Sequence, residues 1–277
     1  MSFSVLSFDP TFKLREFYVT TSTYENQFLR HRSGTMAGKH PFFVGHVFVH
    51  HCMNFESYYY YFSTLQRIQS GLKNIQAIGS DGVIAFQNAI VAAWPDSIKL
   101  QCFLHKKENI KNHLLKSSKL DSANTKVILN DIFGYTIGGI SFEGLVSATN
   151  DADFDYRLHS CQERWNRVAP GFVDWFIKNE SQIFKTRIIF LVRNRVLIKK
   201  TIFTTNGVEN KNSALKDWVD FSRSSLPDFD IKFSKFIDWQ NLEAEKALYS
   251  QGQYTLDDKY SDLKVEYKVW KRMEANA

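Results

Sequence analysis

Cysteines and long apolar runs are scarce in this 277-residue sequence, and each shortage excludes a class of protein. The three cysteines, Cys52, Cys102 and Cys161, lie far apart, so they cannot build a disulfide framework or a four-cysteine zinc site, and they favour a reducing compartment. The best apolar stretches, such as Ile188 to Val192, are too short to span a bilayer, and the segment before Asp9 lacks the basic residues of a secretory signal. The sequence therefore predicts a soluble, intracellular protein with no membrane partner.

Internal repeats and low-complexity segments are also missing, and 13 Gly with 5 Pro leave little material for a long flexible linker. A chain of this length with 44% hydrophobic residues can bury a sizeable core, which excludes intrinsic disorder. The formal net charge of +6 suits a polyanionic partner without requiring one.

Three segments near the N-terminus are rich in β-branched and aromatic residues: 3–8, 15–21 and 41–51. They predict a three-stranded meander. The proline after Asp9 forbids regular continuation of the first segment, so we expect Asp9 at the end of a strand. The basic, glycine-containing stretch 30–40 is typical of an exposed hairpin loop.

Helical and strand patterns then alternate. We expect a helix over 54–71 with Asn54 as its N-cap, a strand over 74–78 that leads to Asp81, a helix over 83–94 and a strand over 97–104. A charged helix from His105 to about residue 115 should turn its lysines and Glu108 toward water. Parallel strands joined by crossover helices after a meander predict a mixed α/β sheet.

The sequence divides into four parts. Residues 1–120 form the first part of a core, 121–187 a mainly helical insertion, and 188–222 a return to the core. In this third part, 188–204 is β-rich, and a helix over about 208–221 carries Glu209 in its first turn. Residues 223–277 form a charged extension that we expect to be helical.

Acidic residues occupy positions suited to a cation. Asp9 and Asp81, at the ends of neighbouring strands, should converge on one edge of the sheet, where ligands bind in open α/β folds. Carboxylate oxygens suit Mg²⁺ and Mn²⁺, which are commonly held together with substrate phosphate oxygens. Glu209, on a helix beside that edge, would complete a two-metal site.

Five segments of the sequence resemble a known family. The resemblance depends on all five together, in this order and at this spacing, and not on any one of them. They are 9–20 (DPTFKLREFYVT), 38–45 (GKHPFFVG), 78–82 (IGSDG), 100–105 (LQCFLH) and 204–216 (TTNGVENKNSALK). The chain resembles the catalytic core of Mutator-like element transposases over roughly residues 3 to 220.

The resemblance implies a ribonuclease H-like fold, interrupted by a helical insertion before the last acid. It implies an Asp-Asp-Glu triad of Asp9, Asp81 and Glu209 that binds two Mg²⁺ or Mn²⁺ ions, and it matches Cys102 and His105 to a Cys-x-x-His pair. The implied chemistry is hydrolysis at transposon ends followed by strand transfer into target DNA. DNA as partner, a homo-oligomeric active state and nuclear residence follow from the same resemblance. Relatives carry an upstream zinc-dependent DNA-binding module, of which this sequence contains nothing.

Other interpretations stay open. Asp-Pro and Ser-Asp-Gly are common turn signatures, and Glu209 alone is typical of a helix first turn. The chain could be a truncated or host-domesticated DNA-binding remnant without activity. It could also be a zinc-stabilised interaction domain centred on Cys102 and His105, although zinc needs four ligands.

Basic residues gather before the last acid. They are Arg187, Arg193, Arg195, Lys199 and Lys200. They could line a DNA-backbone groove or simply solvate the surface.

Overall fold

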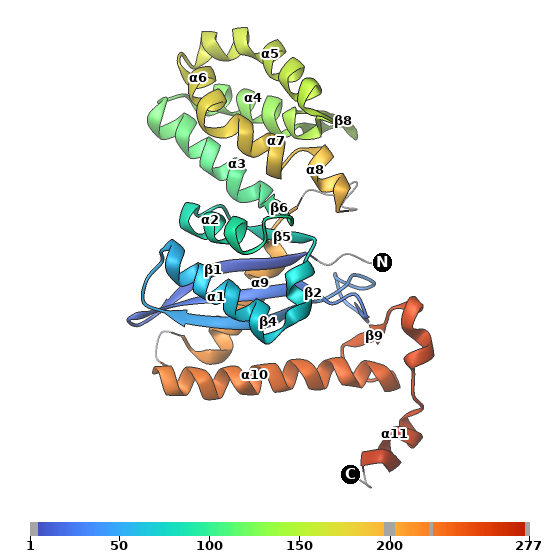
Figure 1. Cartoon of the computed structure of the whole chain (residues 1–277). Helices are drawn as coiled ribbons and strands as arrows, with labels where there is room; N and C mark the ends of the chain where they lie inside the picture. Colours follow the sequence, from blue (N-terminus) through green and yellow to red (C-terminus); the bar gives the residue numbers. More distant parts are fainter. Residues whose placement is uncertain (1–4, 197–202, 222–223, 275–277) are drawn as a thin grey trace. The chain divides into compact units, whose positions relative to one another are not determined.

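The computed structural model describes residues 5–196, 203–221 and 224–274, with the backbone alone for 10–12, 270 and 272–274. The chain forms two compact units. Unit 1 comprises residues 1–53 and 206–277, and unit 2 comprises residues 54–205. Helices occur in both units and the strands pair both antiparallel and parallel, so the fold is mixed α/β (Figure 1).

Unit 1 is built on an antiparallel three-stranded meander with β2 in its centre. Its strands are β1 (Leu6–Leu14), β2 (Phe17–Glu25) and β4 (Phe42–His50), with a separate short pair of β3 (Leu29–His31) and β9 (Tyr254–Leu256). Its helices are α9 (Asn206–Val219), α10 (Leu226–Lys246) and α11 (Tyr267–Glu274), with 3-10 turns at Ala247–Tyr249 and Asp258–Leu263.

Helix α9 packs on all three strands of the meander and on α10, which runs alongside the strands in Figure 1. The cluster they bury is apolar: Leu14, Val19, Val44, Leu215, Val219, Phe229 and Phe236. One polar contact fixes α10 in this layer, because the Gln240 side chain donates to the Val44 carbonyl and accepts from the Val44 amide, both at 2.9 Å. A capping box between Ser225 and Asp228 starts the same helix.

Unit 2 joins a parallel strand pair to a large set of helices. Its first elements are α1 (Phe55–Ile68), β5 (Ala77–Ser80), α2 (Ile84–Ala93), β6 (Ile98–Gln101) and α3 (Phe103–Asn112). Then follow α4 (Ser122–Phe133), β7 (Tyr135–Ile137), β8 (Ile140–Phe142), α5 (Asp151–Val168), α6 (Phe172–Phe176), α7 (Gln182–Arg187) and α8 (Phe190–Arg195). Short 3-10 helices lie at Ser70–Asn74 and Leu145–Ser147, and π-helical turns at His113–Ser117 and Ile177–Ser181.

Helices α1 and α2 pack together through aromatic rings. Phe86 meets Tyr58 and Phe62 edge-on, with ring centroids 4.7 and 5.1 Å apart, and all three rings are fully buried. Because α2 connects two parallel strands, β5, α2 and β6 form a βαβ unit. Among the described residues, no helix combines the length and the apolar composition needed to cross a bilayer.

Most of the predicted elements are confirmed. The meander forms as expected, Asn54 caps α1 by accepting from the Ser57 amide at 3.1 Å, and Asp81 directly follows β5. Glu209 lies in the first turn of α9.

Two strand predictions are wrong. Asp9 lies within β1 and not at its end, because a register shift between Pro10 and Phe12 lets the strand continue past the proline. The β-rich stretch expected over 188–204 contains helix α8; the buried positions Ile189, Val192 and Val196 recur at helical spacing there.

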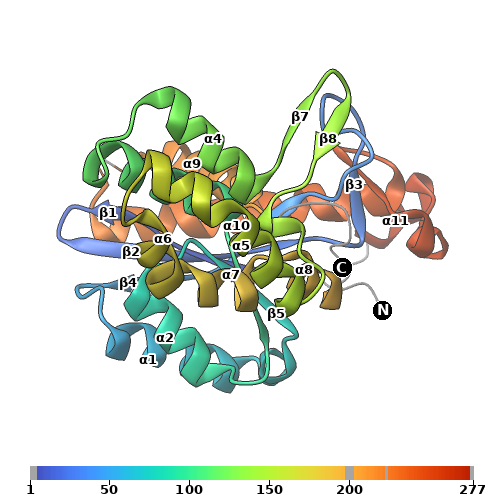
Figure 2. The same ribbon diagram turned by 90° about the horizontal axis from the view of Figure 1, so that it is seen from above.

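Three further features differ from the expected pattern. Lys106 does not face water: it is 5% exposed and donates to Glu180 at 2.7 Å. The insertion also contains a β-hairpin, β7–β8, which extends away from the helices of unit 2 in Figure 2. Strand β6 ends at Gln101, three residues earlier than expected, because Cys102 caps α3.

Candidate functional site

A buried amide in unit 1 holds the first acid of the candidate triad. Asn212 of α9 is 1% exposed, and its Nδ2 donates to Asp9 Oδ2 at 2.7 Å. Thr21 Oγ1 donates to Asn212 Oδ1, also at 2.7 Å, and Thr21 pairs directly with Asp9 across β1 and β2. The Asp9 carboxylate is therefore oriented by a side chain that is itself fixed by the neighbouring strand.

Glu209 lies one helical turn before Asn212. Residues three apart on a helix are neighbours on its surface, so Glu209 projects from the side of α9 that holds Asp9. Glu209 is exposed, and its place in the first turn favours its negative charge through the helix dipole. Glu209 and Asn212, the residue that holds Asp9, are thus neighbours on the surface of α9.

Asp81 belongs to unit 2, where it begins the turn between β5 and α2. It is partly buried, and its Oδ1 accepts from the Val83 amide at 3.4 Å. The turn depends on Gly82, which has φ +109° and whose added Cβ would collide with the amide of Gln101. Gln101 Nε2 also lies 3.5 Å from the Asp81 carbonyl oxygen. The carboxylate is thus presented by a turn whose geometry only glycine readily allows.

Arg187 is linked to this turn by a chain of side chains. Its Nη1 donates to Gln87 Oε1 at 2.5 Å, and Gln87 donates in turn to the hydroxyl of Ser80, the residue before Asp81. Burial lowers the pKa of Arg187 from its ordinary value. Arg187, one of the predicted DNA-contact residues, is therefore connected to the residue that precedes the candidate catalytic Asp81.

Arg193 and Arg195 of α8 are placed differently from Arg187. Arg193 is 7% exposed and donates to the carbonyls of Ile188 at 3.0 Å and Val146 at 3.1 Å, so its guanidinium supports the backbone around α8. Arg195 is exposed. Lys199 and Lys200 lie outside the described residues.

Cys102 and His105 meet through Thr205 in unit 2. The buried Cys102 Sγ accepts from the Thr205 amide at 3.4 Å and from its hydroxyl at 3.1 Å, and the same hydroxyl lies 3.4 Å from His105 Nδ1. Burial would raise the pKa of the Cys102 thiol, but hydrogen bonds with His105 and Thr205 outweigh it and lower that pKa. The pair thereby anchors the residue that immediately precedes α9.

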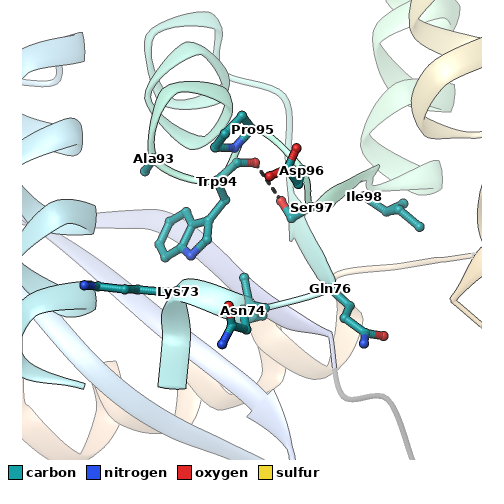
Figure 3. Close-up of a pocket in the computed structure, with 10 residues that line it drawn as sticks. Lys73, Asn74, Gln76, Ala93, Trp94, Pro95, Asp96, Ser97 and Ile98 are labelled. Atoms are coloured by element: carbon teal, nitrogen blue, oxygen red, sulfur yellow. Dashed lines mark hydrogen bonds between the residues drawn. The ribbon is translucent and has the colours of Figure 1, made fainter. Parts of the chain in front are cut away.

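A surface hollow of about 420 Å³ lies elsewhere in unit 2 (Figure 3). Residues 73–76 and 93–98 line it, and Ser97 Oγ donates to the Trp94 carbonyl at 3.1 Å within it. These residues precede β5 and β6, whereas Asp81 and Cys102 follow the same two parallel strands. The hollow is therefore at the opposite ends of these strands from the candidate chemistry.

Sequence reasoning missed Asn212, although a signal was present. The buried positions of α9 are Val208, Asn212, Leu215 and Val219, so an amide occupies one step of an otherwise apolar stripe. A polar residue at such a position needs a hydrogen-bond partner, and Asp9 and Thr21 provide it.

The donor set of unit 1 fits a hard divalent cation. Asp9 and Glu209 offer carboxylate oxygens, and Asn212 orients Asp9 as hydrogen-bonding groups commonly orient metal-binding carboxylates. Neither a protein-family model nor a curated protein matches this chain.

Proposed function

We propose that this chain is a divalent-metal-dependent DNA strand transferase of the Mutator-like transposase type, with Asp9, Asp81 and Glu209 as its metal-binding acids. The observation that carries the proposal is the hydrogen bond from Asn212 to Asp9, because it ties the first acid to the helix that carries the third. The resemblance of the five sequence segments supplies the class of reaction.

The proposal includes a ribonuclease H-like fold. The order of elements supports it: an antiparallel meander, then β5–α2–β6, then a mainly helical region over 122–195 before the helix with the last acid. It requires that Asp81 of unit 2 approach the acids of unit 1 in the active protein. Metal binding that depends on both Asp9 and Asp81 would test this requirement directly.

In the proposed reaction the metal ions supply the chemistry, and the chain positions the three acids that bind them. Bound Mg²⁺ or Mn²⁺ would activate the attacking hydroxyl and stabilise the leaving oxygen. Asp9 enters this site already oriented by Asn212, so little reorganisation is needed on metal binding. Asp81 is presented by the Gly82 turn, and Glu209 by the first turn of α9. Arg187, connected through Gln87 to the Asp81 turn, would hold a substrate phosphate.

The test is Mn²⁺-dependent nicking and strand transfer on supercoiled plasmid and duplex DNA. Wild type is compared with Asp9→Asn, Asp81→Asn and Glu209→Gln, and with Asp217→Asn as a control for an exposed acid on the same helix. We expect each triad variant to lose activity and metal binding by calorimetry while the control keeps both. Wild-type cleavage by Asp81→Asn would remove Asp81 from the proposal.

The inactive alternative gives a different result in the same assay. A truncated or host-domesticated remnant would bind DNA without cutting it, in wild type and variants alike. The DNA partner, a homo-oligomeric active state and nuclear residence belong to the main proposal and stand with it.

A second candidate function is a zinc-stabilised interaction domain, and the hydrogen bonds of Cys102 support it. A thiol with a lowered pKa beside His105 offers two of the four ligands that structural zinc requires. One tightly bound zinc in the purified protein, with no dependence on Mg²⁺ or Mn²⁺, would favour this candidate over the transferase.

A further inference from the structure

Gln101, the last residue of β6, packs against the turn that presents Asp81. It pairs with Ser80, the last residue of β5, so Gln101 and Asp81 lie at the same ends of two parallel strands. A Cβ added to Gly82 would collide with Gln101 Nε2, so the turn covers the amide closely. Gln101 is accordingly buried, with 4% of its surface exposed.

One end of this buried amide lacks a hydrogen-bond partner. Nε2 lies 3.5 Å from the Asp81 carbonyl oxygen, so the amide nitrogen faces the turn. Among the described residues, none donates a hydrogen bond to Oε1. A buried acceptor without a donor destabilises a folded chain, and such groups are rare in native proteins. The oxygen therefore offers an accepting site that a bound molecule can fill.

A second glutamine of unit 2 provides a direct comparison. Gln87 of α2 is buried to the same degree, with 4% exposed, but both ends of its amide are partnered. Its Oε1 accepts from Arg187, and its Nε2 donates to Ser80. Burial alone therefore does not leave a glutamine oxygen unpaired in this part of unit 2. The difference between the two amides draws attention to the end of β6, beside Asp81.

We propose that Gln101 is a binding group of the Asp81 turn, whose Oε1 accepts a hydrogen bond from a water molecule of a hydrated divalent cation. The choice of cation rests on the proposed function, in which Asp81 binds Mg²⁺ or Mn²⁺. Mg²⁺ keeps several of its waters when one or two carboxylates bind it, so hydrogen-bond donors accompany it into a site. Ligands of open α/β folds bind at the carboxyl ends of the strands, which is where Gln101 and Asp81 lie. Gln101 would then orient the hydrated cation without touching the metal itself, as hydrogen-bonding groups around the direct ligands do at other metal sites.

The first test measures Mn²⁺ affinity by isothermal titration calorimetry on the full chain, with no DNA present. Gln101→Met keeps the length of the side chain and removes the amide. Gln66→Met makes the same change where the glutamine donates to the Ala93 carbonyl, at the opposite ends of the strands. We expect Gln101→Met to weaken Mn²⁺ binding about tenfold and Gln66→Met to leave it unchanged. Wild-type affinity in Gln101→Met would overturn the proposal and leave Oε1 to a structural water.

Urea denaturation without metal separates this role from a structural one. Because Oε1 has no described partner to lose, Gln101→Met should leave the urea midpoint at or above that of wild type. Gln87→Met breaks two hydrogen bonds and should lower the midpoint. A fall with Gln101→Met as large as that with Gln87→Met would show that the amide serves the fold, and would overturn the proposal.

The inference and the proposed function can fail separately. If wild type bound no Mn²⁺, both would fail. If wild type and Gln101→Met bound Mn²⁺ equally, only the inference would fail. Mn²⁺ binding that weakens with Gln101→Met in a chain that cuts no DNA would support the inference and count against the proposed function.

Discussion

Replacing Asn212 with alanine should destabilise unit 1 measurably. The substitution removes a hydrogen bond to a carboxylate, which contributes about 1.5–3 kcal/mol, and one from the Thr21 hydroxyl, which contributes about 1 kcal/mol. Asp9 is partly exposed, so solvent screening reduces the first figure. We therefore expect a loss of about 2–3 kcal/mol in the free energy of unfolding.

Urea denaturation measures this loss, and two controls show where it comes from. Asn210→Ala changes an exposed asparagine on the same helix and should alter the free energy of unfolding by no more than about 0.5 kcal/mol. Thr21→Val combined with Asn212→Ala should be less destabilising than the sum of the two single changes, because both remove the same hydrogen bond.

The same substitution of Asn212 should also affect metal binding at the proposed site. Loss of the amide should weaken Mn²⁺ binding roughly tenfold, as loss of an orienting partner does at other metal sites. A destabilisation below about 1 kcal/mol, or strict additivity with Thr21→Val, would refute the reasoning that this network is built into the folded unit.

Three further predictions concern residues away from the Asn212 network. Lys106→Met should cost about 3–5 kcal/mol in urea denaturation by leaving Glu180 buried without its cation, and adding Glu180→Leu should recover most of the loss. Gly82→Ala should destabilise unit 2 by about 1–3 kcal/mol, because φ is +109° and the new Cβ meets Gln101. Burial lowers the pKa of His50 from its ordinary 6.5, so stability should fall as the pH drops below about 6.5.

The sign of the pH effect follows from proton binding. Below its ordinary pKa the unfolded chain protonates His50, whereas burial makes the folded chain protonate the same ring less readily, although the Cys52 carbonyl, 2.8 Å from Nδ1, opposes this effect. The unfolded state thus binds more protons, and acid favours it. Equal urea midpoints at about pH 7.5 and pH 5.5 would contradict this.

The other two predictions have equally direct contrary results. A Lys106→Met, Glu180→Leu double variant no more stable than the single one would show that packing, and not the unpaired charge, sets the cost. Unchanged stability of Gly82→Ala would mean that the Asp81 turn tolerates a side chain.

The candidate site was only partly predictable from sequence. Asp9, Asp81 and Glu209 were assigned as acids of the site from the five segments, and this assignment stays a prediction. Asn212 was within one of those segments but had no assigned role, since its partners Asp9 and Thr21 are about 200 residues away in the chain. The hydrogen bonds from Arg193 to backbone carbonyls could not be predicted either, because composition does not distinguish a buried arginine from a surface one.

The sequence by itself determined the features that depend on neighbours in the chain. The Asn54 cap, the meander strands and the first-turn position of Glu209 follow from local propensity and capping chemistry. The hairpin at Gly138-Gly139 had a local signal too, since both glycines adopt positive φ in its two-residue turn.

Only the tertiary structure decided the features that depend on distant partners. β1 passes through Pro10 because β2 pairs with it across a bulge, and the apolar stretch around Val192 becomes a helix that packs against α7 and β6 of unit 2. Lys106 is buried because Glu180 meets it. Local patterns cannot encode these outcomes, because the energy that settles them comes from contacts between residues far apart in sequence.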